Sequence, residues 1–482
     1  MTTSRVQRGS DVPLIVALVI VGAALRFYRL DTALWYDEIV TVVESVRLPL
    51  ADIVTRFGGD NHHPLYSVLA HLAVSVFGEQ PWALRLPAAL FGVATIPLLY
   101  VFGREVAGRV EAMAAAVVLT VSYHHVWFSQ NARGYTAVLF FVLLSTYALL
   151  RWLDTRRSWF AWLFVLSTAL GAYAHMTTVL VAIGQGLACA TALAGPGRDE
   201  RLRTARTGTA VLFLAAALLT LLMYAPMLAD VGSVMTSGKS SGVDQAALSW
   251  TVAAVLQGLQ VGFGAVWFIV PAILVFGAGL WSYVRQRPLV PLLFVLPVVV
   301  TVAAAVALDR PVRPRFMFFS AGFALLFTVR GAAMVGAGVG RTIGVGRSAA
   351  AQAAVAIVTV GAVVLSARSL PYGYRFPKQD YVEAVTFVEQ AMHSGDRVAV
   401  VADGGEIPIV RYLGRPWPRI DTGAELDALR HDGRPVWVVS TFQSYIESLR
   451  PDLWEILATQ CTEMREVEAT VEDGDIAIHR CP

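Results

Sequence analysis

The chain has 482 residues, of which 56% are hydrophobic and only 15% are charged. Soluble proteins carry about a quarter charged residues, so this composition, with a mean hydropathy of +0.59, indicates a membrane protein. The formal net charge of +3 is too small to indicate a nucleic-acid partner, and the basic residues are better explained as signals that orient the chain in a bilayer.

The first apolar run, from Val12 to Leu25, resembles a signal peptide because Arg5 and Arg8 precede it. A signal peptide would end in a small-residue cleavage site, whereas this run is followed by Arg26 and further bulky residues. We therefore expect it to be retained as the first membrane-spanning helix.

Similar apolar runs recur through most of the chain. They predict a polytopic α-helical membrane protein with about eleven transmembrane helices. The predicted topology depends most on the short turn between Tyr173 and Thr178. If the residues on both sides of it formed one span, every later segment would lie on the opposite side of the membrane. The candidate spans are residues 12–30, 82–103, 110–128, 135–153, 159–175, 177–195, 208–229, 263–284, 288–308, 316–337 and 349–367.

Arginines are concentrated in alternate connections between these spans, and the positive-inside rule makes that side cytoplasmic. The residues are Arg5, Arg8, Arg104, Arg109, Arg151, Arg156, Arg157, Arg198, Arg201, Arg203, Arg206, Arg285, Arg287, Arg341 and Arg347. Residues 31–81, 129–134, 230–262, 309–315 and 368–482 would then lie outside the cytoplasm. The abundance of Ala, Val, Gly and Arg favours a bacterial source, and hence a bacterial plasma (inner) membrane.

The first outer loop, residues 31–81, carries apolar residues at near-helical spacing. One such stretch runs from Ile39 to Phe57 and is interrupted by Pro49, and a second runs from Pro64 to Phe77. Amphipathic segments of this kind are typical of helices that lie in the membrane interface.

The chain is expected to divide into a transmembrane domain (residues 1–370) and a soluble extracytoplasmic domain (residues 371–482). Strand-like runs at 397–401 and 436–439 alternate with helical patterns at 380–392 and 424–430. This alternation predicts a small α/β domain with a mainly parallel sheet, in which Gly404-Gly405 is a turn. Cys461 and Cys481 either form a disulfide or remain as two thiols.

An acidic pair follows the first span, in the sequence Leu34-Trp35-Tyr36-Asp37-Glu38. Carboxylates near a bilayer are costly unless water, a partner or a function keeps them there. Adjacent side chains diverge, so one carboxylate could be a general base while the other orients a sugar or an ion. The alternative is that Asp37 caps a helix that begins at Ile39.

Histidines occur in the same loop, as His62-His63-Pro64. They could carry protons, donate hydrogen bonds to an anion, or simply lie at the interface. A metal site is disfavoured because the pair lacks the i, i+4 spacing of helical metal ligands. His124-His125 and His175 lie at span ends, where an interface anchor or a cavity wall is the simpler interpretation.

Arginines on the predicted outer side are unexpected under the positive-inside rule, and a function would explain them. Arg133 begins the fourth span, and Arg310, Arg313 and Arg315 cluster in a later outer loop. The planar guanidinium fork suits a lipid phosphate. At a span end, Arg133 could instead extend its side chain to the interface without any function. Headgroup binding without catalysis is the alternative, and Arg85 is a weaker member of this set.

Taken together, the stretch from Leu34 to about Trp152 resembles the GT-C fold glycosyltransferases that use polyprenyl-phosphate-linked sugars. It is closest to glycosyltransferase family 39, the protein O-mannosyltransferase and aminoarabinose transferase group. The resemblance rests on Leu34-Trp35-Tyr36-Asp37-Glu38, His63-Pro64-Leu65-Tyr66, Ala83-Leu84-Arg85-Leu86-Pro87, Ser129-Gln130-x-Ala132-Arg133-x-Tyr135 and Pro314-Arg315-Phe316.

The resemblance implies that Asp37 is the catalytic base, with Glu38 beside it for acceptor or structural contacts, and these two are the catalytic candidates. Many relatives carry Glu where this chain has Asn131, so any role of that glutamate is in doubt here. Arg133, Tyr135 and Arg315 would bind the donor phosphate. The full set of expected substrate-binding residues is His62, His63, Tyr66, Arg85, Gln130, Asn131, Arg133, Tyr135, Arg313 and Arg315.

The expected reaction is an inverting transfer of a hexose or pentose from a polyprenyl-phosphate-linked donor to an acceptor hydroxyl on the extracytoplasmic face. No cofactor is required, and a divalent cation is possible but not implied. The acceptor could be a glycan, a glycolipid or a protein, and the sequence identifies neither it nor the sugar. The alternative function is a transporter or flippase of a polyprenyl-phosphate lipid.

Overall fold

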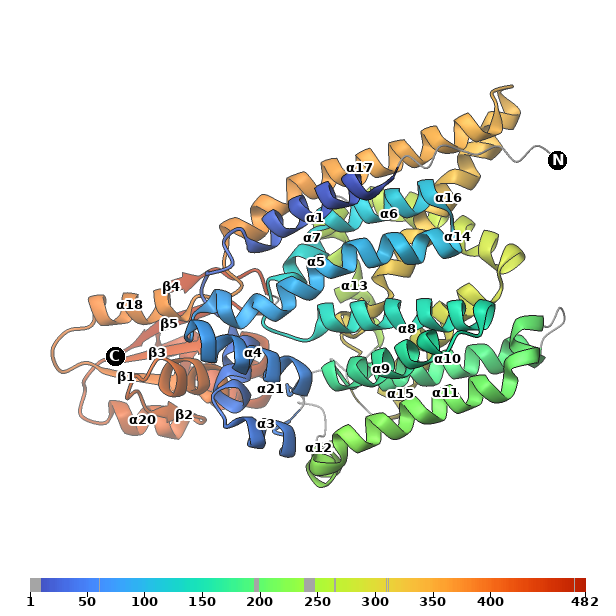
Figure 1. The fold of residues 1–482 in the computed structure, drawn as a ribbon. Helices are drawn as coiled ribbons and strands as arrows, with labels where there is room; N and C mark the ends of the chain where they lie inside the picture. The colour runs from blue at the N-terminus through green and yellow to red at the C-terminus, as the bar shows by residue number, and fades with distance from the viewer. Residues whose placement is uncertain are drawn as a thin grey trace, which may run out of the picture.

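The computed structural model describes residues 10–59, 61–194, 199–237, 248–263, 266–308, 310, 312–471 and 473–482. Arg5, Arg8 and Arg198, which contribute to the predicted orientation, lie outside these residues. The molecule has a long helical bundle with a smaller domain at one end, and the first described residues lie toward the other end (Figure 1).

The bundle is built from helices that follow the predicted apolar runs closely. They are α1 (Val12–Phe27), α5 (Pro81–Val106), α6 (Arg109–Val121), α7 (Tyr123–Ser129), α8 (Tyr135–Thr155), α9 (Ser158–Ala174), α10 (Thr177–Ala194), α11 (Glu200–Tyr224), α14 (Ile269–Gln286), α15 (Leu289–Ala307), α16 (Ala321–Thr342) and α17 (Arg347–Arg375). Two further helices, α12 (Leu228–Ser237) and α13 (Leu248–Phe263), flank residues outside the described part.

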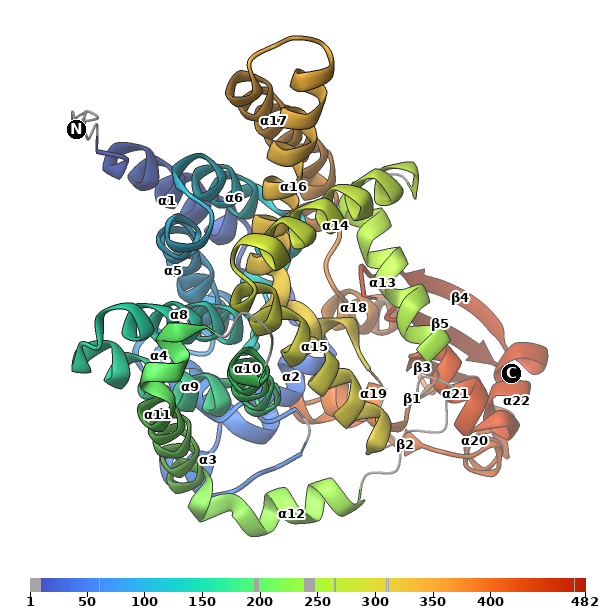
Figure 2. The same cartoon turned by 90° about the vertical axis from the view of Figure 1, so that its right-hand side faces the viewer.

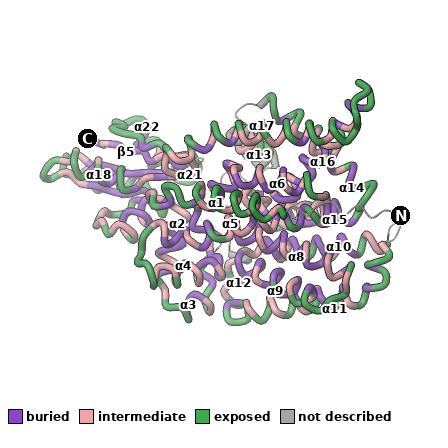
Figure 3. The backbone as a smooth tube through the Cα atoms, turned by 45° about the horizontal axis from the view of Figure 1, so that its top comes forward, coloured by how far each residue is buried: buried purple, intermediate pink, exposed green. Residues whose placement is uncertain are grey.

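Apolar side chains on the outside of the bundle fit a lipid environment. Leu214 and Leu218 of α11 are 69% and 59% exposed, and Ile357 of α17 is 72% exposed. Figure 3 shows exposed residues along the outer sides of these helices. Such apolar surface would be unfavourable in water. The protein is therefore a multi-pass membrane protein, as predicted.

Within the described residues, eight helices are long and apolar enough to cross a membrane, or up to nine if the bent pair α6 and α7 is one span. The helices α1 and α9 are apolar but shorter. The predicted total of eleven spans stays a prediction. The short turn predicted between Tyr173 and Thr178 is confirmed, because α9 and α10 are separate helices.

The third predicted span is bent by 58° between α6 and α7. A helix that ends inside a protein leaves carbonyl groups without partners. Here the fully buried Arg26 donates hydrogen bonds to the carbonyls of Leu119 (3.2 Å) and Thr120 (3.0 Å), and its guanidinium also lies 2.6 Å from Nδ1 of His125. Arg26 therefore stabilises the break.

The first outer loop contains three short helices, α2 (Tyr36–Thr41), α3 (Leu50–Thr55) and α4 (Pro64–Phe77). A π-helical turn (Val42–Val46) extends α2. As the sequence predicts, Pro49 separates the first two helices, and Pro64 occupies the first turn of α4, where its missing N–H costs nothing.

The C-terminal domain is an α/β domain, as predicted, but its five-stranded sheet is mixed rather than mainly parallel. The strand order is β2-β1-β3-β5-β4. The pairs β2–β1 and β1–β3 are parallel, while β5 pairs antiparallel with both β3 and β4. The strands are β1 (Arg397–Val401), β2 (Arg419–Ile420), β3 (Val436–Thr441), β4 (Thr462–Val467) and β5 (Ile476–Cys481).

Helices cover both faces of this sheet. They are α18 (Tyr381–Ala391), α19 (Ala402–Gly405), α20 (Gly423–Arg430), α21 (Gln443–Leu449) and α22 (Pro451–Gln460). Gly404 and Gly405 thus end a short helix, where the sequence predicted a turn. Cys461 and Cys481 form a disulfide between the ends of β4 and β5. The expected domain boundary at residues 370 and 371 falls inside α17, which continues to Arg375.

One hydrophobic core joins the outer loop to the C-terminal domain. Ile39 and Tyr66 of the loop belong to the same buried cluster as Val400 and Ile409 of the domain. Figure 1 shows the loop helices beside the domain at the same end of the bundle. Burial of shared apolar surface therefore holds the acidic pair under the domain.

Candidate active site

Asp37 lies on α2 and forms two ion pairs. Its Oδ2 atom is 3.1 Å from Nη1 of Arg133 and 3.0 Å from Nη1 of Arg315. Burial would by itself raise the pKa of the Asp37 carboxyl, but the neighbouring arginines outweigh burial and hold the pKa below its usual value. The Asp37 side chain keeps 16% of its surface exposed, so this charged group remains open to a ligand.

Glu38, the next residue, has entirely different surroundings. Its side chain is fully buried and accepts two hydrogen bonds from Arg85, at 2.8 and 2.6 Å. The backbone N–H of Ala132 donates a third, at 2.6 Å. Arg85 also donates to three backbone carbonyls, those of Leu30, Thr32 and Ala33. These contacts use the hydrogen-bonding capacity of Glu38 inside the protein.

Two other predicted site residues, Asn131 and Gln130, form hydrogen bonds with the chain around α1 and α2. The side-chain oxygen of Asn131 accepts a hydrogen bond from the indole N–H of Trp35 at 3.2 Å. Gln130 donates to the carbonyl of Arg26 in the last turn of α1 (3.1 Å) and to that of Tyr28, just beyond it (2.7 Å). At the position where many relatives carry Glu, Asn131 thus contacts the residue that precedes the first turn of α2.

An aromatic group adjoins the ion pairs. The ring of His63 lies 5.8 Å from the ring of Tyr135 and 4.7 Å from the ring of His175. Tyr135 in turn accepts a hydrogen bond from Arg133 at 3.4 Å. The sequence singled out His175 only as a histidine at a span end, and the turn between α9 and α10 brings it here.

Burial lowers the pKa of His63 well below its ordinary value, and the Arg133 charge lowers it further, so the ring is neutral near pH 7. Its Nδ1 atom is 3.2 Å from the carbonyl of Ala174, whereas its buried Nε2 atom has no hydrogen-bond partner among the described residues. The geometry fits a ring whose Nε2 atom is available to a bound ligand.

Two further predicted residues have contacts of a structural kind. His62 stacks on Phe57, with ring centroids 5.3 Å apart, and accepts a hydrogen bond from the N–H of Gly58. The buried hydroxyl of Tyr66 donates to the carbonyl of Leu84. These contacts tie the outer loop together and join α4 to α5.

A cavity of about 790 Å³ opens above Asp37, between the bundle and the C-terminal domain. Its lower wall includes Asp37, Arg313 and Arg315. Its upper wall comes from the C-terminal domain and includes Val401, Ala402, Asp403, Gly404, Thr441, Phe442, Ser444, Tyr445, Ile446, Val471 and Asp473. No motif in the sequence pointed to these residues.

Two polar residues just beyond α17 also lie near the site, although no sequence motif marks them. Lys378 donates a hydrogen bond to the carbonyl of Gln130, and burial lowers the pKa of its amine to about 7. Gln379 accepts a hydrogen bond from the N–H of Tyr36 at 2.9 Å and donates to Thr441 (3.0 Å) and to the carbonyl of Gly474 (2.8 Å). A polar pair in an interdomain connection gives no sequence signal that separates it from an ordinary linker.

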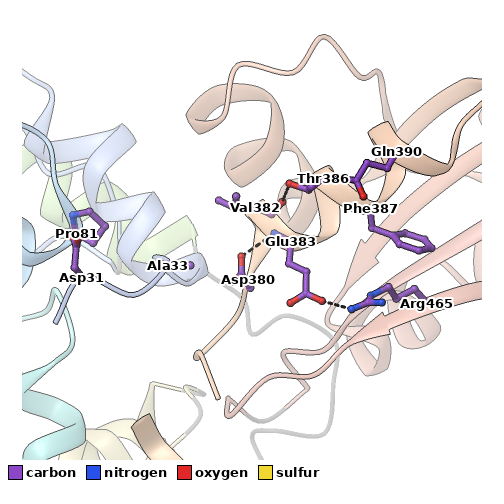
Figure 4. Close-up of a pocket in the computed structure, with 10 residues that line it drawn as sticks. All are labelled: Asp31, Ala33, Pro81, Asp380, Val382, Glu383, Thr386, Phe387, Gln390 and Arg465. Carbon is purple, nitrogen blue, oxygen red and sulfur yellow. Dashed lines mark hydrogen bonds and ion pairs between the residues drawn. The ribbon is translucent and has the colours of Figure 1, made fainter. Parts of the chain in front are cut away.

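A second cavity, of about 560 Å³, lies between Pro81 and α18 and contains none of the predicted site residues. Figure 4 shows Glu383 paired with Arg465 on its wall. Within the described ranges, no group of three or more His, Cys, Asp or Glu side chains is placed to hold a metal ion.

Comparison with known proteins supports the predicted resemblance. Residues 61–229 match the model of the family described as dolichyl-phosphate-mannose-protein mannosyltransferase. No curated protein matches the chain.

Solved structures resemble nearly the whole chain. Apo ArnT from Cupriavidus metallidurans is 14% identical with a TM-score of 0.56, and the match covers 98% of both chains. The oligosaccharyltransferase of Archaeoglobus fulgidus, in complex with Zn and sulfate, is 12% identical with a TM-score of 0.59, and the match covers 96% of this chain and 72% of that one. Both the helical bundle and the C-terminal domain are therefore included in the match.

The predicted resemblance is thus confirmed at the level of fold. The family match covers residues 61–229, and the likeness to the solved structures extends over the C-terminal domain. The chain is a multi-pass membrane protein with the GT-C fold.

Proposed function

We propose that this protein transfers a sugar from a polyprenyl-phosphate-linked donor to an acceptor hydroxyl, with Asp37 as the general base and inversion at the anomeric carbon. The observation that carries the proposal is the position of Asp37 between Arg133 and Arg315 at the base of the cavity. The solved structure of ArnT bound to undecaprenyl phosphate, 13% identical with a TM-score of 0.53 and covering 98% of both chains, supports the class of donor.

The two arginines suit a donor phosphate. In a phosphodiester donor the phosphate carries one negative charge, and a second charge develops as the sugar leaves. Because Asp37 already occupies both guanidinium groups, the incoming phosphate would compete with it for them. Loss of these ion pairs would raise the pKa of Asp37, so donor binding itself would make the carboxylate a better base.

The reaction is a single displacement. The acceptor oxygen forms a bond to the anomeric carbon while the bond from that carbon to the phosphate oxygen breaks. The electron pair of the broken bond leaves with the polyprenyl phosphate, and Asp37 takes the acceptor proton. The neutral His63 donates through Nδ1 to the carbonyl of Ala174, so its Nε2 atom would accept a hydrogen bond from a hydroxyl of the sugar or of the acceptor.

The remaining predicted residues have supporting roles in this proposal. Glu38 and Arg85 form a buried ion pair that fixes α2 against α5. Asn131 orients Trp35, and Gln130 anchors the end of α1 and the residue that follows it. Arg313 lines the cavity and adds positive potential at the donor site.

We further propose that the cavity and the C-terminal domain face the extracytoplasmic side of a bacterial plasma membrane. The disulfide between Cys461 and Cys481 supports this orientation, because disulfides persist in oxidising compartments. The arginine-rich connections at the opposite end of the predicted spans agree with it.

The test is sugar transfer by the purified protein with a panel of polyprenyl-phosphate-linked sugars and membrane extracts as acceptors. In Asp37→Asn we expect transfer to fall about 10³-fold, since a positioned acid or base contributes about 10² to 10⁴. Binding of bare polyprenyl phosphate should be at least as tight as in the unmodified protein, because Arg133 and Arg315 lose their competitor.

The matched control is Asp52→Asn, which changes an acid of the same loop that pairs with Arg56 at 3.3 Å. This variant should transfer sugar normally. Near-normal transfer by a folded Asp37→Asn variant would refute the assignment of the base. Saturable lipid-phosphate binding without transfer from any donor would favour the transporter alternative.

A further inference from the structure

The cavity lies at a special position of the C-terminal sheet. Residues that line it follow directly after β1 (Ala402, Asp403) and after β3 (Phe442, Ser444). The two strands are parallel neighbours, so their carboxyl ends meet at one edge of the sheet. This edge forms the upper wall above Asp37.

The connections that leave these two strands go to opposite faces of the sheet. After β1 the chain packs Ile407 and Ile409 into the cluster on the face of α18. After β3 it packs Ile446 and Leu453 into the cluster on the other face, with α20 and α22, which Figure 2 shows at the edge of the molecule. Such a divergence opens a crevice at the carboxyl ends of parallel strands, where α/β proteins bind ligands.

Backbone conformation also marks this crevice. Five described residues other than glycine have positive φ angles, and three of them line the cavity: Ala402 (52°), Phe442 (59°) and Asp473 (56°). Such conformations are costly and concentrate at ligand-binding sites.

Asp473 holds the strained segment in place. Its carbonyl accepts a hydrogen bond from the N–H of Phe442 at 3.1 Å, and its carboxylate accepts one from the N–H of Ser444 at 3.2 Å. The ring of Phe442 therefore lies against Tyr36, with centroids 5.2 Å apart, one residue before Asp37.

The side chains in the crevice suit a carbohydrate. Three half-buried rings, those of Tyr36, Phe442 and Tyr445, offer faces against which the C–H groups of a sugar ring can pack. Asp403 keeps 61% of its side chain exposed despite its ion pair with Arg419, and it can accept hydrogen bonds from sugar hydroxyls. Aromatic walls with a few placed polar groups are typical of small-molecule sites.

A peptide or a phosphate fits this wall less well. Strand β1 is paired with β2 and β3, and β3 is paired with β1 and β5, so neither strand has a free edge for an added peptide strand. The acidic side chains of Asp403 and Asp473 oppose a phosphate at the upper wall. The arginines at the lower wall attract one.

We propose that the crevice at the ends of β1 and β3 binds a carbohydrate acceptor and presents one of its hydroxyls to Asp37. This inference rests on the proposed function and assigns the C-terminal domain the choice of acceptor. The donor phosphate occupies the lower wall, and the acceptor enters from the aqueous side above it.

The experiment uses the full-length protein with Phe442→Gly and Tyr445→Ala. Glycine suits the positive φ of residue 442, so the first change removes the ring with little added strain. We expect the KM for a carbohydrate acceptor to rise at least tenfold in each variant. The Kd for bare polyprenyl phosphate and the rate of donor hydrolysis without acceptor should stay within about twofold.

The matched control is Phe387→Ala, which removes an aromatic ring of the same domain from the wall of the other cavity. Its acceptor KM should not change. An unchanged acceptor KM in both crevice variants, with normal melting temperatures, would overturn the proposal. So would weaker binding of the sugar-bearing donor in these variants, or transfer to serine and threonine peptides in preference to carbohydrates.

A binding measurement separates this inference from the proposed function. Saturation-transfer NMR with a mixture of cell-envelope oligosaccharides reports carbohydrate binding without turnover. Binding that is lost in Phe442→Gly and Tyr445→Ala, in a protein that transfers no sugar, would support the crevice and refute the transferase. Sugar transfer by a protein in which neither variant changes carbohydrate binding would support the transferase and refute the crevice.

Discussion

Glu38 and Asp37 are neighbours in sequence with opposite surroundings. Glu38 is fully buried against Arg85, whereas Asp37 borders the cavity. Removing one partner of a buried ion pair leaves the other charge unsatisfied, at a cost of about 3 to 5 kcal/mol. We therefore expect Glu38→Gln to lower the melting temperature of the purified protein strongly, and Asp37→Asn to lower it much less, because the cavity can hydrate the freed arginines.

The control for this comparison is Glu383→Gln. Glu383 pairs with Arg465 at the surface, where both side chains are nearly half exposed. Exposed pairs contribute about 0 to 1 kcal/mol, so the melting temperature should hardly move. Equal melting temperatures for Glu38→Gln and Glu383→Gln would contradict the structural role of the buried pair.

At the scale of elements, the position of α2 depends on the C-terminal domain through Gln379. Its side chain links the N–H of Tyr36 to Thr441 and Gly474. In Gln379→Leu the N–H of Tyr36 loses its partner, at a cost of about 1 to 3 kcal/mol for an unsatisfied group, whereas Thr441 still donates to the carbonyl of Gly474 at 3.3 Å. We expect faster hydrogen exchange in residues 36–41 and 436–441 and a lower turnover number, with the Kd for polyprenyl phosphate little changed.

The control Gln390→Leu alters an exposed glutamine at the end of α18 and should leave exchange and turnover unchanged. If Gln379→Leu gave native exchange rates in both segments, the domain would be held to α2 by the shared hydrophobic core alone.

At the scale of the whole molecule, the prediction is the orientation in the membrane. Cys189 is buried and the other two cysteines form a disulfide, so new surface cysteines would be the reactive ones. In intact bacterial cells, Thr386→Cys on α18 should react with a membrane-impermeant maleimide. Thr342→Cys, at the far end of α16, should react only after permeabilisation. The opposite labelling pattern would reverse the proposed topology.

Local sequence patterns are enough to predict the individual helices and strands. Apolar runs marked the bundle helices, Pro49 and Pro64 marked the starts of α3 and α4, and alternating patterns gave β1 and α18 within a residue or two. Motif order gave the resemblance, which the full-length structural match supports. These features follow from hydrophobic periodicity and from backbone chemistry, which act over a few neighbouring residues.

Only the tertiary structure decided which distant residues meet. Asp37 and Arg315 are 278 positions apart, and Gln379 and Tyr36 are 343 apart. No sequence pattern predicted the mixed sheet, the break between α6 and α7, or the crevice above Asp37. The physical reason is that burial and charge pairing depend on the packing of whole elements, and a local pattern in the sequence does not contain that packing.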